Sequence, residues 1–129
     1  MQKSKILIVE DNEINALVLK RLIDTVAHPI HAINDVEAFK AVEDHQFALI
    51  LMDINLGGQS LDGEEIMRKL KADTRFRDLP IFAVTSYAMP GDEQRFLNAG
   101  FDAYFSKPIN RDKLLTGVRK TLQQVTTEA

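Results

Sequence analysis

The sequence contains no cysteine, which excludes a disulfide framework and thiolate metal sites. It also lacks any apolar run near the ~20 residues that a membrane-spanning helix needs. Its first residues, MQKSKILIVED, become acidic too early for a signal peptide. The net charge of −3 at pH 7 gives no indication of binding to nucleic acid or to an acidic membrane surface. We therefore expect a cytoplasmic protein that has neither nucleic acid nor membrane as a partner.

The length of 129 residues, of which 45% are hydrophobic, is typical of one globular domain with a real core. Internal repeats, low-complexity tracts and linker-like stretches are missing from the sequence. We expect a single domain over residues 1–129, with a core from about residue 4 to residue 123.

Short apolar runs alternate with amphipathic segments along the chain. The runs are Ile6–Val9, Ile30–Ile33, Ala48–Met52, Ile81–Val84 and Phe101–Phe105. Three of them are too apolar to have a wet face, so we expect strands that are buried on both sides. Between the first two runs, one face of a predicted helix carries Ile14, Leu17, Val18 and Leu22.

Helix starts are also visible, because Asn34 with Glu37 and Asp62 with Glu65 have the spacing of a capping box. Gly100 stands where a helix-ending glycine is expected. The alternation predicts an α/β fold, a flavodoxin-like doubly wound sheet of five parallel strands with helices on both faces. The expected strand order is 2-1-3-4-5, which opens a crevice beyond the carboxyl ends of the first and third strands.

Polar residues stand where the predicted strands end. Glu10 and Asp11 follow the first strand, Asp53 the third, Thr85 the fourth and Lys107 the fifth. Three carboxylates this close raise one another's pKa unless a cation neutralises them. Oxygen ligands without a nearby histidine or cysteine favour Mg²⁺. Any one of these residues alone is ordinary at a strand end, but together they predict a site for a phosphoryl group.

Over nearly its whole length the chain resembles the receiver domain of two-component response regulators. The segments that carry the resemblance are "KILIVEDNEIN", "ALILMDIN", "LDGEEI", "IFAVTSYA" and "AGFDAYFSKPI". The resemblance implies that Asp53 accepts a phosphoryl group from a phosphohistidine, and that Glu10, Asp11, Asp53 and the backbone carbonyl of Asn55 bind Mg²⁺. The protein would then be no conventional enzyme, since it would catalyse only its own phosphorylation and dephosphorylation.

The resemblance also assigns the residues that respond to the phosphoryl group. Thr85 matches the hydroxyl that contacts it, and Lys107 matches the lysine that pairs with it. Tyr104 matches the aromatic switch residue. The Lys107–Pro108 peptide bond matches one that is cis in this fold.

Two departures from the family pattern concern the loops beside the site. Gly57 stands where the family usually has a proline, and the ten residues from Asp53 to Gly63 are about two more than is common. We expect a longer and more mobile loop there, because glycine adds backbone freedom. Tyr87, two residues after Thr85, is expected to shield the phosphoryl group from water.

The expected partners are a sensor histidine kinase or a histidine phosphotransfer protein and a downstream protein. The predicted docking patch for the first consists of Ile14, Asn15, Val18, Pro108 and Ile109. Core packing is the alternative interpretation for Ile14 and Val18. The downstream partner is expected on the face formed by the fourth helix, the fifth strand and the fifth helix, because the sequence stops after that helix without an output domain.

Several alternatives stay open at this point. The chain resembles receivers of hybrid histidine kinases as well as independent receivers, and a pseudo-receiver that binds partners without phosphorylation is conceivable. A flavodoxin would need a Ser-, Thr- and Gly-rich loop where this chain has "VEDNEIN". A haloacid-dehalogenase-type phosphatase would need a second acid at Asn55. None of His28, His31 and His45 is expected to lie with the acids.

Overall fold

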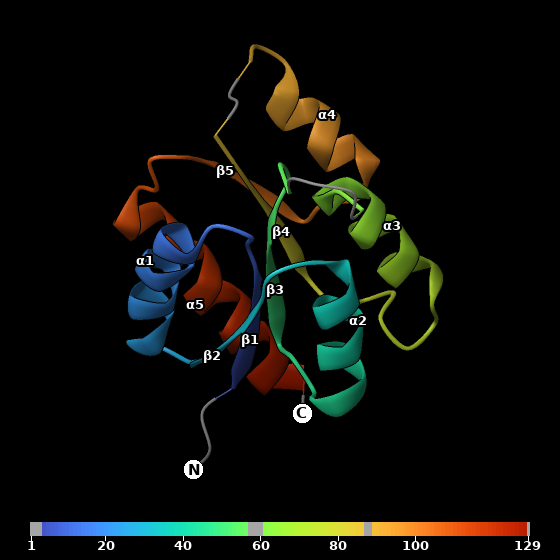
Figure 1. The fold of residues 1–129 in the computed structure, drawn as a ribbon. Helices are drawn as coiled ribbons and strands as arrows, with labels where there is room; N and C mark the ends of the chain where they lie inside the picture. The colour runs from blue at the N-terminus through green and yellow to red at the C-terminus, as the bar shows by residue number, and fades with distance from the viewer. Residues whose placement is uncertain (1–3, 57–60, 87–88, 129) are drawn as a thin grey trace.

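The computed structural model describes residues 4–56, 61–86 and 89–128, with strands and helices alternating along the chain (Figure 1). The elements are β1 (Lys5–Val9), α1 (Glu13–Asp24), β2 (His28–Ala32), α2 (Asp35–Asp44), β3 (Leu49–Asp53), α3 (Gly63–Ala72), β4 (Ile81–Thr85), α4 (Asp92–Ala99), β5 (Ala103–Ser106) and α5 (Arg111–Glu128).

The five strands form one parallel sheet in the order β2-β1-β3-β4-β5, which confirms the predicted fold. The fifth strand begins two residues later than predicted. Asp102, directly before this strand, donates its N–H to the Ile81 carbonyl and accepts the Ile81 N–H on its carboxylate. Its side chain therefore takes part in the pairing with the start of β4, where a backbone acceptor would otherwise be expected.

Alternate residues of the central strands enter two separate cores. Leu7 and Val9 pack with residues of α2, α3 and α4 on one face of the sheet. Ile6 and Ile8 pack with residues of α1 and α5 on the other face. Figure 1 shows the same two layers of helices on either side of the sheet. All five residues of β3 are buried, which explains why this strand has no polar face before Asp53.

Helix α1 buries a different face from the one that its most conspicuous apolar residues share. Its buried residues are Ala16, Leu19 and Ile23. Ile14 is 74% exposed and Val18 is 51% exposed. The core-packing interpretation of Ile14 and Val18 is therefore wrong, and an apolar surface faces outward from this helix.

The helix ends carry the expected caps with one difference. Asp62 and Glu65 form a complete capping box at α3. At α2, Asn34 accepts the N–H of Glu37, whereas the Glu37 carboxylate accepts the N–H of Ile33 instead of closing the box on Asn34. Gly100 ends α4 with a φ of +133°, a conformation that favours glycine.

Among the described residues, the helices are too short or too polar for any of them to cross a membrane.

Candidate functional site

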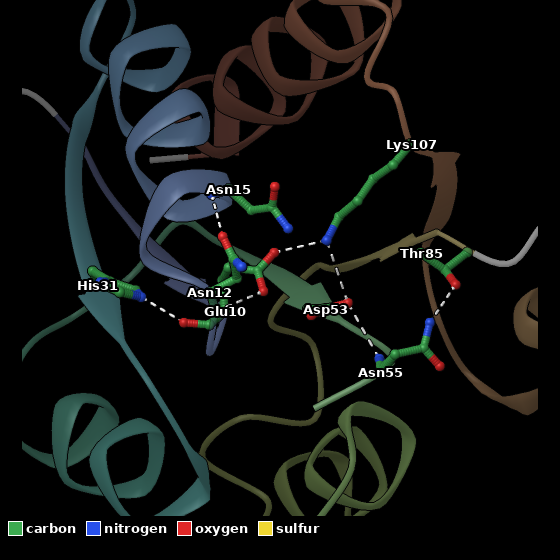
Figure 2. A network of polar contacts seen from close by, with 8 residues as sticks. All are labelled: Glu10, Asn12, Asn15, His31, Asp53, Asn55, Thr85 and Lys107. Carbon is green, nitrogen blue, oxygen red and sulfur yellow. Dashed lines mark hydrogen bonds and ion pairs between the residues drawn. The ribbon is translucent and has the colours of Figure 1, made fainter. Parts of the chain in front are cut away.

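Four of the polar residues predicted at the strand ends meet beyond the carboxyl ends of the strands, namely Glu10, Asp53, Thr85 and Lys107 (Figure 2). Glu10, Asp53 and Thr85 are the buried polar side chains among the residues that the structure describes, each at most 5% exposed. They lie at the carboxyl ends of β1, β3 and β4, which are neighbours in the sheet. A parallel sheet brings such strand ends together regardless of their separation in sequence.

Lys107 reaches into this group from the end of β5. Its ammonium nitrogen lies 2.7 Å from Glu10 Oε1 and 3.7 Å from Asp53 Oδ1. The backbone N–H of Lys107 donates to the carbonyl of Thr85 at 2.8 Å, which fixes where the side chain begins. The Lys107–Pro108 bond is cis, as the resemblance implied. The site therefore holds one compact positive charge between two buried carboxylates.

The acidic residues still outnumber that single cation. One carboxylate oxygen from each of Glu10, Asp11 and Asp53 lies within 4.8 Å of the other two. Burial raises the pKa of Glu10 to about 7, and a hydrogen bond to Asp53 adds to this rise, while the Lys107 ammonium opposes it. The site thus offers carboxylate oxygens with an excess of negative charge, which are ligands that Mg²⁺ prefers. Asp11 is exposed to solvent, and this suits an ion that keeps several of its waters. The residues present thus fit that ion.

Asn55 contributes more than the backbone carbonyl expected of it. Its N–H donates to Asp53 Oδ1 at 3.2 Å, and its side-chain amide donates to the Thr85 hydroxyl at 2.9 Å. Figure 2 shows this amide between β3 and β4. The side chain thereby holds the Thr85 hydroxyl in place. A sequence pattern carries no signal for such a contact, because it depends on the direction that the chain takes after β3.

The turn from β1 into α1 is bonded on two sides. Asn12 caps α1 by accepting the N–H of Asn15 at 2.9 Å, and its own N–H donates to Glu10 Oε2 at 3.2 Å. Behind the turn, His31 Nε2 lies 2.6 Å from the backbone carbonyl of Glu10. His31 therefore contacts the backbone of Glu10 and not its carboxylate, which is consistent with the structural role expected for it. His45 is elsewhere, 3.2 Å from the Lys5 ammonium.

Tyr104 is half-buried rather than turned fully to solvent. Its ring stacks on Phe96 of α4, with centroids 5.9 Å apart and planes 15° apart. Partial burial and, next, the carboxylates of Asp92 and Glu93 raise the pKa of its hydroxyl. The Arg95 guanidinium lies over the same Phe96 ring, 4.1 Å from its centre.

The residues predicted to form a docking patch are split between two grooves beside α1. A groove of about 290 Å³ is lined by Asn15, Val18, Leu19, Leu22, Lys107, Pro108 and Ile109. Ile14 lies in a second groove of about 410 Å³, together with Glu13, Ala16, Leu17, Lys20, His31 and Ile33. Lys107 lines the first groove and also contacts Glu10, so this groove lies beside the site. The predictions made for Gly57 and Tyr87 concern residues outside the described part of the chain.

Comparisons with known proteins agree with this geometry. A family model described as the response regulator receiver domain matches residues 6–119. The polar-differentiation response regulator DivK of Brucella anthropi is 39% identical over 123 residues, which are 95% of this chain and 98% of the relative. The DivK protein of Brucella ovis is 38% identical over the same shares.

Solved structures point the same way. The signal receiver domain of a signal transduction histidine kinase from Syntrophus aciditrophicus superposes with a TM-score of 0.83 and 30% identity, over 95% of this chain and 92% of the other. A CheY-like response regulator receiver domain from Methanospirillum hungatei gives a TM-score of 0.83 at 29% identity, over 99% and 100% of the two chains.

Proposed function

This chain belongs to the response regulator receiver domain family, and from that premise we propose that it accepts a phosphoryl group on Asp53 from a phosphohistidine in the presence of Mg²⁺. The observation that carries the proposal is the buried Asp53 carboxylate, which lies 3.7 Å from the Lys107 ammonium and beside the oxygens of Glu10 and Asp11. Receiver domains are not conventional enzymes, and here residues 1–129 would form one such domain.

In the proposed transfer an Asp53 oxygen attacks phosphorus. The new O–P bond forms as the P–N bond to the donor histidine breaks, and the departing imidazole takes up a proton. The product is an acyl phosphate, from which attack by water on phosphorus later releases inorganic phosphate. Glu10, Asp11, Asp53 and the Asn55 carbonyl would hold the Mg²⁺, which when bound neutralises negative charge on the phosphoryl oxygens.

Lys107 and Thr85 act directly on the same oxygens. The Lys107 ammonium is already poised beside Asp53, and its charge stabilises the negative charge that gathers during transfer. The Thr85 hydroxyl, now held by the Asn55 amide, moves to contact the phosphoryl group. Tyr104 then leaves its stacking on Phe96 and turns inward, which changes the face formed by α4, β5 and α5 for a downstream protein. A crystal structure with a phosphate mimic in which Tyr104 stays stacked would contradict this switch.

The transfer is tested by incubating the protein with acetyl phosphate and Mg²⁺ and measuring its intact mass. We expect the mass of one phosphate on the wild type, none after chelation of Mg²⁺ and none on Asp53→Ala. A wild type that takes no phosphate from acetyl phosphate or from a phosphorylated histidine phosphotransfer protein would overturn the proposal and favour a pseudo-receiver.

The proposed donor is a sensor histidine kinase or a histidine phosphotransfer protein, which docks along the groove beside Val18, Pro108 and Ile109. A second candidate function for this chain is that of a receiver domain within a hybrid kinase, because the receiver of a Syntrophus aciditrophicus histidine kinase is 30% identical to it. The cytoplasmic location expected from the sequence stays a prediction.

The docking surface gives a prediction with a matched control. Val18→Asp places a charge in the groove, and we expect transfer from a phosphohistidine protein to slow at least about tenfold, since one buried charge costs more than 1.4 kcal/mol of binding. Phosphorylation by acetyl phosphate, which needs no docking surface, is expected to be unchanged. Val36→Asp is the control, because Val36 is 70% exposed on α2 and lies outside the groove. Equal slowing in both variants, or with both donors, would contradict this assignment.

A further inference from the structure

Glu10 is held in place from behind as well as from within the site. Its carboxylate faces Lys107 and Asp53, but its backbone carbonyl points the other way, toward His31 on β2. The Glu10 N–H donates to the carbonyl of Ala32 at 3.0 Å. Both backbone groups of Glu10 are therefore tied to the end of β2, and Figure 2 shows the contact with His31.

The chemistry of this contact assigns the proton. A carbonyl oxygen can only accept a hydrogen bond, so His31 must carry its hydrogen on Nε2. The distance of 2.6 Å between Nε2 and the Glu10 oxygen is slightly shorter than is usual for an N–H···O bond. When His31 is neutral its Nδ1 is then the unprotonated nitrogen.

The bond acts at the point where the chain must change direction. β1 ends at Val9, and Asn12 already caps α1, so Glu10 and Asp11 alone connect the strand to the helix. Asp11 is exposed and gains no support from burial. A shift of the Glu10 carbonyl would rotate the peptide that carries Asp11, and would move the two acids relative to Asp53.

We propose that His31 is a positioning residue for the cation site. Its Nε2–H bond to the Glu10 carbonyl fixes the orientation of the backbone that connects Glu10 to Asp11. The proposal rests on the proposed function, in which these acids bind Mg²⁺. Partners behind a metal ligand commonly alter metal affinity by 10-fold or more when they are removed, because the ligand loses its fixed orientation. His31 also lines the groove that contains Ile14 and Leu17, so the same side chain contacts a surface groove and the backbone of Glu10.

The first test reads the tautomer of the wild type directly. A long-range ¹⁵N–¹H NMR spectrum at a pH where His31 is neutral is expected to show Nε2 protonated and Nδ1 unprotonated. The opposite tautomer would overturn the proposal, because the bond to Glu10 could not then form. This measurement needs neither Mg²⁺ nor phosphate.

The second test compares Mg²⁺ affinity among variants, followed by the amide shifts of Asp11 and Asp53 during titration. For His31→Leu we expect the dissociation constant to rise about tenfold. For His31→Gln, whose amide can still donate, the constant should stay within about threefold of the wild type. His28→Leu is the control, since His28 is an exposed histidine on the same strand.

Phosphorylation separates positioning from a general loss of structure. In His31→Leu the Mg²⁺ concentration for half-maximal phosphorylation by acetyl phosphate should rise, while the rate at saturating Mg²⁺ stays close to that of the wild type. An unchanged Mg²⁺ affinity in His31→Leu would overturn the proposal and leave the proposed function standing. A wild type that binds no Mg²⁺ would overturn both.

Discussion

Replacing Gly63 with alanine is expected to destabilise the protein by about 3 kcal/mol, because the added carbon has no room. A Cβ at this position would overlap the backbone carbonyl oxygen of Asp53 and lie 2.9 Å from the Cα of Ile54. Gly63 also donates its N–H to the Ile54 carbonyl at 3.3 Å. All of these neighbours are backbone atoms, so only a shift of α3 away from the end of β3 can relieve the overlap.

The same overlap should disturb the phosphoacceptor, since the carbonyl oxygen that the added carbon meets belongs to Asp53 itself. We expect Gly63→Ala to slow phosphorylation by acetyl phosphate at least about tenfold, as misplacement by about 1 Å can cost more than that. Urea unfolding and intact mass over time measure the two effects.

Gly117→Ala is the matched control. Its nearest neighbour would be the ring tip of Phe105 at 3.3 Å, which is a side chain that can move. Alanine stabilises a helix by up to about 1 kcal/mol relative to glycine, which offsets the cost of this contact. We therefore expect little net change in the free energy of unfolding or in phosphorylation. If Gly63→Ala matched the wild type in both measurements, the close approach of α3 to Asp53 would be refuted.

Asp53→Asn is expected to make the protein inactive and more stable at once. The pKa of Glu10 is raised from 4.5 to about 7 by burial and by its contact with Asp53. Between these two values the native state binds more protons than the unfolded state, so the free energy of unfolding falls as pH rises through that window. Removing the Asp53 charge lowers the Glu10 pKa, which should flatten this slope and add about 1 kcal/mol of stability near pH 7.

The measurement is urea unfolding without divalent cations at several pH values from 4.5 to 8. Mg²⁺ should stabilise the wild type by mass action. With Mg²⁺ present, the difference in the free energy of unfolding between the wild type and Asp53→Asn should therefore become smaller. Asp112→Asn, which changes an exposed carboxylate in the first turn of α5, serves as the control and should retain phosphorylation. An unchanged pH slope in Asp53→Asn would show that the two carboxylates do not interact as described. A gain in stability with a loss of activity would mean that the site is maintained against its own repulsion.

The placement of the main site residues could be predicted from the sequence for a simple reason. Alternating strands and helices dictate a parallel sheet, and such a sheet gathers its strand ends at one edge. Asp53 and Lys107 therefore meet although 54 positions in the chain separate them. The prediction required only the order of elements and not the details of side-chain packing.

The buried face of α1 could not be chosen in the same way. This helix has apolar residues on two sides, Ala16, Leu19 and Ile23 on one and Ile14, Leu17 and Val18 on the other. Periodicity detects a face only when the opposite face is polar. The contacts of His31 and Asn55 were missed for another reason, since each depends on a side-chain direction within a turn. The closeness of Gly63 to Asp53 depends on how α3 packs, which residue types do not reveal.

The edge strand β2 has a consequence for how the molecule behaves at high concentration. His28 donates its N–H to Ser4, and Ala32 accepts from Glu10, so these residues direct their backbone groups toward β1. Pro29 and His31 alternate with them and direct theirs to the open edge of the sheet. Because proline has no N–H, a strand from another molecule that approached this edge would meet a break in the ladder within a strand of five residues. We therefore expect Pro29 to disfavour aggregation through pairing of β2 strands from different molecules.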